Sequence, residues 1–181
     1  MGAAEQGVRI ERLAERHAID RFTCGQAELD EYLQRHALNN RSRHLSTTYV
    51  ALVGDEVTGF ATIAPSQVSS AELTPATRRG LPRYPLPTMT LARLATHVES
   101  RGAGVGRQLL LHALLEATRM ATEFGCVGVR VAAKPDAVGF YQQFGFVPLE
   151  PSVSAPVDAS EQPTHLFLAL NRIEDALRPR A

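Results

Sequence analysis

The sequence has no long apolar run, and this absence limits where the protein can be. No run approaches the roughly 20 apolar residues that a membrane-spanning helix needs. The N-terminal residues, Met1 to Gln6, lack the basic-then-apolar order of a secretory signal peptide. We therefore expect a cytoplasmic protein with no membrane anchor.

Cysteine is scarce, which argues against a disulfide scaffold and against a zinc site. The 2 cysteines, Cys24 and Cys126, lie far apart and show neither the paired spacing of zinc ligands nor that of a disulfide framework. We expect two reduced thiols with structural roles and no bound metal.

The chain also has no excess of either charge. Its 19 Lys and Arg residues balance 19 Asp and Glu residues, which excludes strong global attraction to nucleic acid but leaves local basic patches open. What the sequence does have is a globular composition, with 44% hydrophobic and 21% charged residues in 181. We expect a single domain over residues 1–181, with its core at roughly residues 8–170.

Hydrophobic periodicity predicts alternating strands and helices. Strands are expected over residues 8–13, 47–53, 57–64, 89–96, 127–132 and 165–170. One helix is expected after a capping box at Thr23-x-x-Gln26, ending near Arg41; others are expected over residues 105–121 and 136–144. Five prolines in residues 65–87 predict a functional loop with a short helix near 75–80, and residues 150–163 a surface loop.

The first chemical signal is the glycine-rich run from Arg101 to Gly106, which stands between a strand and a long helix. Small residues let backbone N–H groups approach a phosphate, and the helix N-terminus adds partial positive charge there. The same pattern also serves as a plain connector, so both interpretations stay open. A dinucleotide fingerprint would need glycine at Arg107, and a Walker A loop would need lysine there.

Three motifs in order resemble those of the GNAT acetyltransferases. The run from Arg101 to Gly106 is similar to their R/Q-x-x-G-x-G/A pyrophosphate motif, and Leu91 to Thr96 to their central strand, whose bulge holds the pantetheine arm. Phe140 to Phe146 resembles their F-Y-x-x-x-G-F signature, whose tyrosine commonly protonates the departing thiolate.

The resemblance implies a fold, a cofactor and a set of residues. The implied fold is a mixed α/β (α+β) GNAT fold: a mostly antiparallel sheet with a central splay and helices on both faces. The implied cofactor is acetyl-CoA and the implied catalytic residue is Tyr141. The implied acetyl-CoA-binding residues are Leu94, Ala95, Thr96, Arg101, Gly102, Ala103, Gly104, Val105, Gly106 and Arg107.

The N-terminal part resembles one branch of this family, the GNAT toxins of toxin–antitoxin systems. The matching stretches are Phe22 to Gln26, Leu29, Leu33 and residues 37–47. This resemblance implies acetylation of the α-amine of aminoacyl-tRNA, which blocks translation. It also implies a cognate antitoxin and a homodimer.

The residues themselves fit acyl transfer to an α-amine. Such a reaction needs a neutral amine, stabilisation of an oxyanion and an acid for the leaving group. Glu72, Glu99, His97 and His112 are candidate bases, but each is more typical of a surface or packing residue. A lysine amine (pKa about 10.4) needs a base, whereas an α-amine (about 7.7 to 8.0) is substantially neutral near pH 7 to 8.

Arginines supply the candidate contacts to RNA. Two groups, one on and after the first helix and one in or beside the proline-rich loop, could hold phosphates of a tRNA acceptor end. The residues are Arg35, Arg41, Arg78, Arg79, Arg83 and Arg93. Charge pattern alone favours a solvated surface, and only the resemblance favours RNA. Acetylation of a small amine or a protein N-terminus, and a non-catalytic acyl-CoA-binding regulator, remain alternatives.

Overall fold

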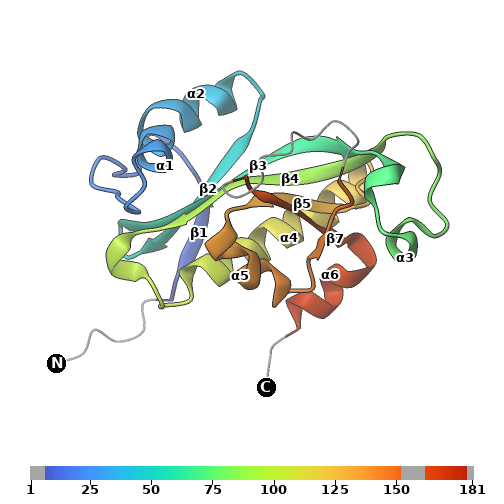
Figure 1. Ribbon diagram of the computed structural model, residues 1–181. Coiled ribbons are helices and arrows are strands. Elements are labelled where there is room, and N and C mark those ends of the chain that lie inside the picture. The colour runs from blue at the N-terminus through green and yellow to red at the C-terminus, as the bar shows by residue number, and fades with distance from the viewer. Residues whose placement is uncertain (1–6, 152–161, 179–181) are drawn as a thin grey trace. The chain divides into compact units, whose positions relative to one another are not determined.

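The computed structural model describes residues 7–151 and 162–178 (Figure 1). Residues 152–161, most of the surface loop expected over 150–163, lie outside the described residues. The chain divides into two compact units. Unit 1 comprises Met1–Ala64 and Ala92–Ala113, and unit 2 comprises Pro65–Leu91 and Leu114–Ala181.

Within the described residues, the strands form a mixed sheet in the order β1-β2-β3-β4-β5-β7-β6. Their bounds are β1 Arg9–Arg12, β2 Thr47–Val53, β3 Glu56–Val68, β4 Leu86–Thr96, β5 Gly128–Ala133, β6 Val147–Pro148 and β7 Thr164–Ala169. The β4–β5 pair is parallel, while β1–β2, β2–β3, β5–β7 and β6–β7 are antiparallel. The mixed, mostly antiparallel sheet expected from the sequence is confirmed. The β4–β5 ladder ends at Leu91 and Val131, whereas β4 continues to Thr96. The central splay stays a prediction.

Helices cover both faces of the unit 1 strands. Tyr49 and Val50 are neighbours on β2 and therefore point to opposite faces. The Tyr49 ring packs against His112 of α4 (Val105–Glu123), with 4.4 Å between centroids. On the other face Val50 pairs with Phe60, and the Phe60 ring stacks on Tyr32 of the N-terminal helical segment.

The N-terminal helical segment consists of α1 (Ala27–Glu31), a π-helical turn η1 (Tyr32–His36) and α2 (Ala37–Ser42). The expected helix is therefore present, but the capping box assigned to Thr23 and Gln26 is wrong. Gln26 occupies the N-cap position without a side-chain hydrogen bond. The Thr23 hydroxyl instead donates to the Asp30 carboxylate at 2.8 Å, because that stronger, charged acceptor lies within reach.

In unit 2, β5 lies between β4 and β7. Short helices connect the strands, and a last one follows β7. These are η2 (Ser70–Glu72), α3 (Pro75–Arg78), η4 (Pro135–Ala137), α5 (Val138–Gln142) and α6 (Leu170–Leu177). Gly145 follows α5 with φ +91°, as expected for a residue that closes a helix. The predicted short helix near residues 75–80 is α3.

The proline-rich loop is shorter than the sequence predicts. Strand β3 continues through Pro65 to Val68, and β4 begins at Leu86 rather than Met89. The hydroxyl groups of Ser66 and Thr88 lie 2.7 Å apart, and Thr90 donates to Ser66 at 2.7 Å. These contacts between the ends of β3 and β4 outweigh the tendency of proline to end a strand. Helix α6 was not predicted, although Leu170, Ile173 and Leu177 have helical spacing and Ile173 is buried.

A substitution at Gly128 tests how unit 2 is packed. A Cβ atom added there would overlap the Leu168 carbonyl oxygen and the Phe167 ring. We expect Gly128→Ala to lower the free energy of unfolding by about 1–3 kcal/mol, a typical overpacking cost, measured by urea unfolding. Gly139→Ala is the matched control, because its Cβ meets nothing within 4 Å and alanine favours its helix. Wild-type stability of Gly128→Ala would contradict this packing.

Three findings bear on cofactors and location. Both cysteines are free and buried, and burial raises the pKa of each thiol. Across residues 7–151 and 162–178, no group of three or more His, Cys, Asp or Glu side chains is placed to hold a metal ion. No helix in the same ranges is long and apolar enough to cross a membrane.

Candidate active site

The glycine turn of unit 1 leads directly into α4, as the sequence predicts. Gly102 and Gly104 have φ values of +77° and +81°, and a Cβ at either position would meet nothing within 4 Å. The first helical hydrogen bond runs from the Gln108 N–H to the Gly104 oxygen at 3.1 Å. The amides of Val105 and Gly106 therefore have no acceptor inside the helix. An open, glycine-lined helix N-terminus of this kind fits a pyrophosphate.

The Arg101 side chain holds the glycine turn in place by a long-range hydrogen bond. One guanidinium nitrogen donates to the Cys24 carbonyl at 2.6 Å, across 77 residues of chain. Gly25 has φ +84°, and a Cβ there would lie 3.0 Å from the same guanidinium. The Arg101 side chain thus fixes the start of the turn against the segment that precedes α1. Ala103 follows in the turn, where its N–H donates to the Ser100 oxygen at 3.3 Å, and Arg107 lies in the first turn of α4.

The residues Leu94, Ala95 and Thr96 form the last part of β4, also in unit 1. A Cβ at Gly59 would lie 2.9 Å from the Ala95 oxygen and 2.8 Å from Val105 Cγ1. Only glycine lets β3 lie this close to both the end of β4 and the start of α4. Sequence reasoning did not single out Gly59, although a glycine inside a strand is a signal of close backbone approach.

Tyr141 lies in unit 2, on α5. Its side chain is 6% exposed, and its ring packs edge-on against Phe140 and Phe146, with centroids 5.1 and 5.5 Å away. Burial raises the pKa of its hydroxyl. The hydroxyl therefore stays protonated through the neutral range, which is the state that a proton donor needs.

Three of the four candidate bases have side-chain contacts within the protein. The Glu72 carboxylate accepts from the Ser69 N–H at 2.7 Å and lies 3.9 Å from Arg130. The His97 ring accepts from the Glu99 N–H at 3.2 Å and packs against Phe22. His112 packs against Tyr49. These contacts agree with the interpretation of Glu72, His97 and His112 as surface or packing residues, and Glu99 is exposed.

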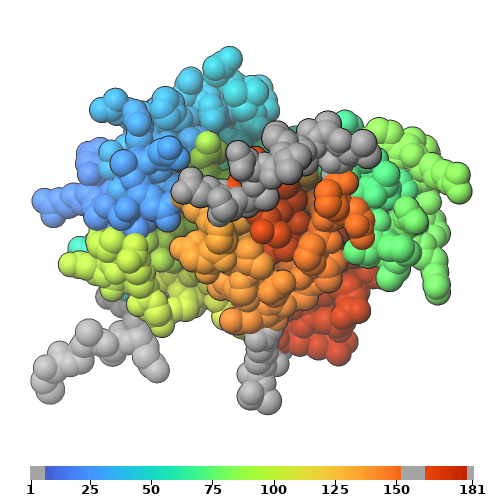
Figure 2. Space-filling view, in the orientation of Figure 1, coloured from blue at the N-terminus to red at the C-terminus, as the bar shows by residue number. Residues whose placement is uncertain are grey.

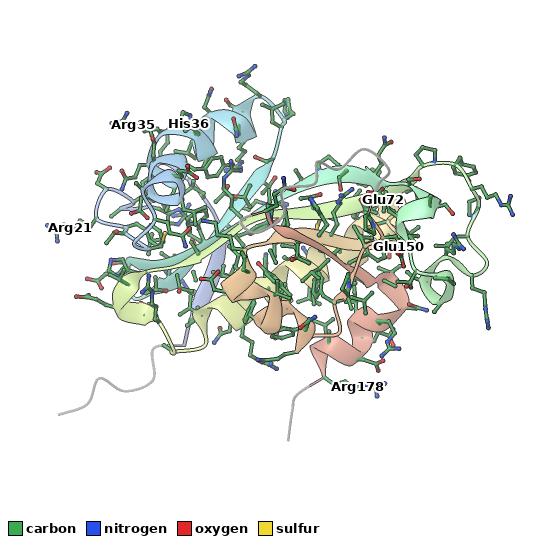
Figure 3. All side chains as sticks on the ribbon, in the orientation of Figure 1. Arg21, Arg35, His36, Glu72, Glu150 and Arg178 are labelled. Atoms are coloured by element: carbon green, nitrogen blue, oxygen red, sulfur yellow. The ribbon has the colours of Figure 1, made fainter. Side chains whose placement is uncertain are left out.

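The arginines of unit 1 are held by intramolecular contacts. Arg35 lies 3.5 Å from Glu31 and reaches outward from the helical segment (Figure 3). Arg41 donates to the Leu13 carbonyl at 2.8 Å. The Arg93 guanidinium lies over the Tyr32 ring, 3.6 Å from its centroid, which is a cation–π geometry.

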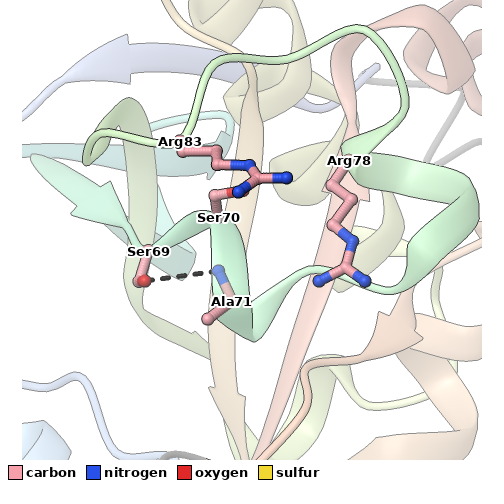
Figure 4. A pocket seen from close by; sticks show the side chains of 5 residues that line it. All are labelled: Ser69, Ser70, Ala71, Arg78 and Arg83. Atoms are coloured by element: carbon pink, nitrogen blue, oxygen red, sulfur yellow. Dashed lines mark hydrogen bonds between the residues drawn. The ribbon is translucent and has the colours of Figure 1, made fainter.

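In unit 2, two of the three predicted arginines lie at an open hollow of about 420 Å³. Arg78 and Arg83 line it with Ser69, Ser70 and Ala71 (Figure 4). Arg79 follows Arg78 and is exposed. Sequence reasoning missed the serines, although Ser69-x-x-Glu72 has the capping-box pattern and forms that box in the structure. Of the six predicted arginines, three belong to unit 1 (Arg35, Arg41 and Arg93) and three to unit 2 (Arg78, Arg79 and Arg83).

Comparison with known proteins identifies the family. Residues 44–148 match the acetyltransferase (GNAT) domain model. A tRNA-acetylating toxin of Mycobacterium tuberculosis (strain ATCC 25618 / H37Rv) is 31% identical over 160 residues, which cover 88% of this chain and 90% of the toxin.

Two solved structures have the same fold over nearly the whole chain. AtaT complexed with acetyl-methionyl-tRNAfMet has a TM-score of 0.81 and 26% identity, covering 95% of this chain and 100% of AtaT. A tyrosine-to-phenylalanine mutant of AtaT, bound to the C-terminus of the antitoxin AtaR and acetyl-CoA, has a TM-score of 0.72 and 25% identity, covering 93% and 96%. With the glycine turn and the family match together, this chain belongs to the GNAT family of acetyl-CoA-dependent N-acetyltransferases.

Proposed function

We propose that this acetyltransferase acetylates the α-amine of aminoacyl-tRNA and so acts as a translation-blocking toxin. The observation that carries the proposal is a set of three arginines, Arg78, Arg79 and Arg83, on a chain with an acetyl-CoA-type glycine turn. No carboxylate in the described ranges pairs with these arginines. Unpaired arginines together suit a polyanionic acceptor better than a small amine. The activity of the mycobacterial relative supports the same choice.

The proposed roles are those that the family resemblance implies, and the local geometry of the residues is compatible with them. Bound acetyl-CoA supplies the acetyl group as a thioester. The amides of Val105 and Gly106, with the open glycines beside them, hold its pyrophosphate, and Arg101 keeps the turn in place. Backbone groups from Leu94 to Thr96 orient the acyl end and stabilise negative charge on its carbonyl oxygen. The Tyr141 hydroxyl gives its proton to the leaving thiolate.

Three further features belong to the proposal. The two units act as one GNAT domain, which is supported by a family match that draws on segments of both. A cognate antitoxin neutralises the enzyme, as the antitoxin AtaR binds AtaT. The resemblance to the toxin branch also implies that the active form is a homodimer. A tRNA substrate places the protein in the cytoplasm.

The arginine assignment predicts a strong salt dependence. Phosphate contacts release counterions, so affinity for tRNA should fall steeply as salt rises. We expect the Arg78→Ala, Arg79→Ala double variant to flatten the log–log salt slope by about 0.7 to 0.9 for each lost contact. The variant should also lose growth arrest on expression, while its acetyl-CoA affinity stays at the wild-type value.

The control removes the same charge elsewhere in unit 2. Arg172 and Arg178 are both exposed and both pair with Asp175, at 3.6 and 3.7 Å. Replacing both by alanine should leave the salt slope unchanged. An already flat slope in the wild type would leave only a small-amine or protein acetyltransferase.

A further inference from the structure

The hollow of unit 2 is built around a fixed turn. The Ser69 hydroxyl accepts from the Ala71 N–H at 3.3 Å, and the Glu72 carboxylate accepts from the Ser69 N–H at 2.7 Å. These bonds hold η2 in one conformation and commit the Ser69 side chain to the turn. Ser70, half-buried, lines the hollow beside them. The turn thus places Ser70 at the hollow on a fixed backbone.

Two guanidinium groups extend toward this turn from separate segments. Arg78 comes from the end of α3 and Arg83 from the loop that follows, and both extend into the same open space (Figure 4). Among the described residues neither has an ion-pair partner, and the acidic residue of the turn, Glu72, already contacts Ser69 and Arg130. Two like charges at one hollow favour binding of an anion there, and guanidinium groups bind phosphate with two parallel hydrogen bonds.

The residue after Arg83 in the chain is an exposed aromatic residue, Tyr84. Tyr84 is 66% exposed and lies in the loop between α3 and β4. An aromatic ring left this open contributes little to a core. Tyr84 is adjacent to Arg83 in the chain. Proteins hold single-stranded nucleic acid by combining aromatic rings, on which the bases stack, with cations that hold the backbone.

We infer that the hollow and Tyr84 form a site for one unpaired nucleotide of an RNA chain. Arg78 and Arg83 hold its phosphodiester with the Ser70 hydroxyl, and its base stacks on the Tyr84 ring. The inference rests on the proposed function, in which the acceptor is a tRNA, and adds that the enzyme reads the single-stranded end of that RNA.

The test is equilibrium binding by fluorescence anisotropy to two deacylated RNA hairpins. One carries a short unpaired 3′ tail and the other is blunt. Tyr84→Ala should weaken binding of the tailed hairpin by about 5- to 150-fold, the range for loss of one stacked base, and leave the blunt hairpin unchanged. Tyr84→Phe should bind like the wild type. The control is Phe124→Ala, since Phe124 is 83% exposed elsewhere in unit 2 and should have no effect.

A second readout separates stacking from charge. Arg83→Ala should flatten the salt slope by about 0.7 for a single-stranded contact, whereas Tyr84→Ala should leave that slope unchanged. Equal losses on both hairpins, or wild-type binding by Tyr84→Ala, would overturn the site. Loss of acetyl-CoA affinity in Arg83→Ala would also overturn it, since the hollow would then hold the coenzyme's phosphates.

The result is separable from the proposed function. Binding is measured on deacylated RNA, whereas the function is measured as acetylation of aminoacyl-tRNA. If the wild type acetylates aminoacyl-tRNA and Tyr84→Ala still binds the tailed hairpin normally, the nucleotide site is wrong and the function stands. If the tailed hairpin shows the expected loss but aminoacyl-tRNA is not acetylated, the site stands on RNA binding and the toxin proposal falls.

Discussion

Gly104→Asp is expected to lower the affinity for acetyl-CoA by at least about 100-fold, equivalent to two charge-assisted hydrogen bonds of about 1.5 kcal/mol each. The aspartate side chain would enter the open space beside Gly104, at the N-terminus of α4. Its carboxylate would take the anion position and repel a pyrophosphate. Calorimetric titration with acetyl-CoA measures the loss.

Two variants separate charge from backbone strain at this position. Gly104→Asn has nearly the same shape without the charge, and asparagine tolerates positive φ as well as aspartate does. It should keep much of the affinity that Gly104→Asp loses. Gly80→Asp introduces the same residue at φ +77° in another open position and should bind acetyl-CoA normally. Equal affinity in a folded Gly104→Asp and the wild type would remove the pyrophosphate assignment.

Tyr141→Phe is expected to lower kcat by about 10²- to 10⁴-fold, the usual contribution of a general acid. The change deletes one hydroxyl and keeps the ring against Phe140 and Phe146, so the fold and the acetyl-CoA affinity should survive. Steady-state acetylation kinetics measure the loss of kcat, and the melting temperature shows whether the fold survives.

The matched variant is Tyr32→Phe, which also removes a buried tyrosine hydroxyl. The Tyr32 hydroxyl lies 3.2 Å from the Ser46 hydroxyl, so its loss should cost stability. It should leave kcat unchanged. Wild-type turnover in Tyr141→Phe would reassign Tyr141 to packing.

The elements that sequence reasoning found are those with a strong local signal. Gly54 has φ +61° between β2 and β3, and the hairpin around it was predicted with the correct bounds of β2 and a start of β3 one residue late. The turn before α4 was predicted because glycines stand just ahead of a long apolar stripe, and in the structure Gly102 and Gly104 adopt positive φ. The extension of β3 was missed because its support, the Ser66–Thr88 contact, joins residues 22 positions apart.

The site was predicted less completely than the fold, for a related reason. A sequence shows which residues are arginines but not which guanidinium groups have partners. Arg41 bonds a carbonyl 28 positions away, and Arg93 lies over Tyr32 from a distant strand. Only the folded chain distinguishes these arginines from Arg78 and Arg83, which share an open hollow. The roles of Arg35, Arg41 and Arg93 in tRNA binding stay predictions.

The most direct test of the central claim is product analysis after incubation of the wild-type protein with acetyl-CoA and total aminoacyl-tRNA. The proposed function predicts N-acetyl-aminoacyl groups, released from tRNA by mild alkaline hydrolysis and identified by mass spectrometry, with one free thiol formed for each acetyl group transferred. If free thiol appears only with small amines or peptides, and the amino acids released from tRNA carry no acetyl group, the toxin assignment is contradicted.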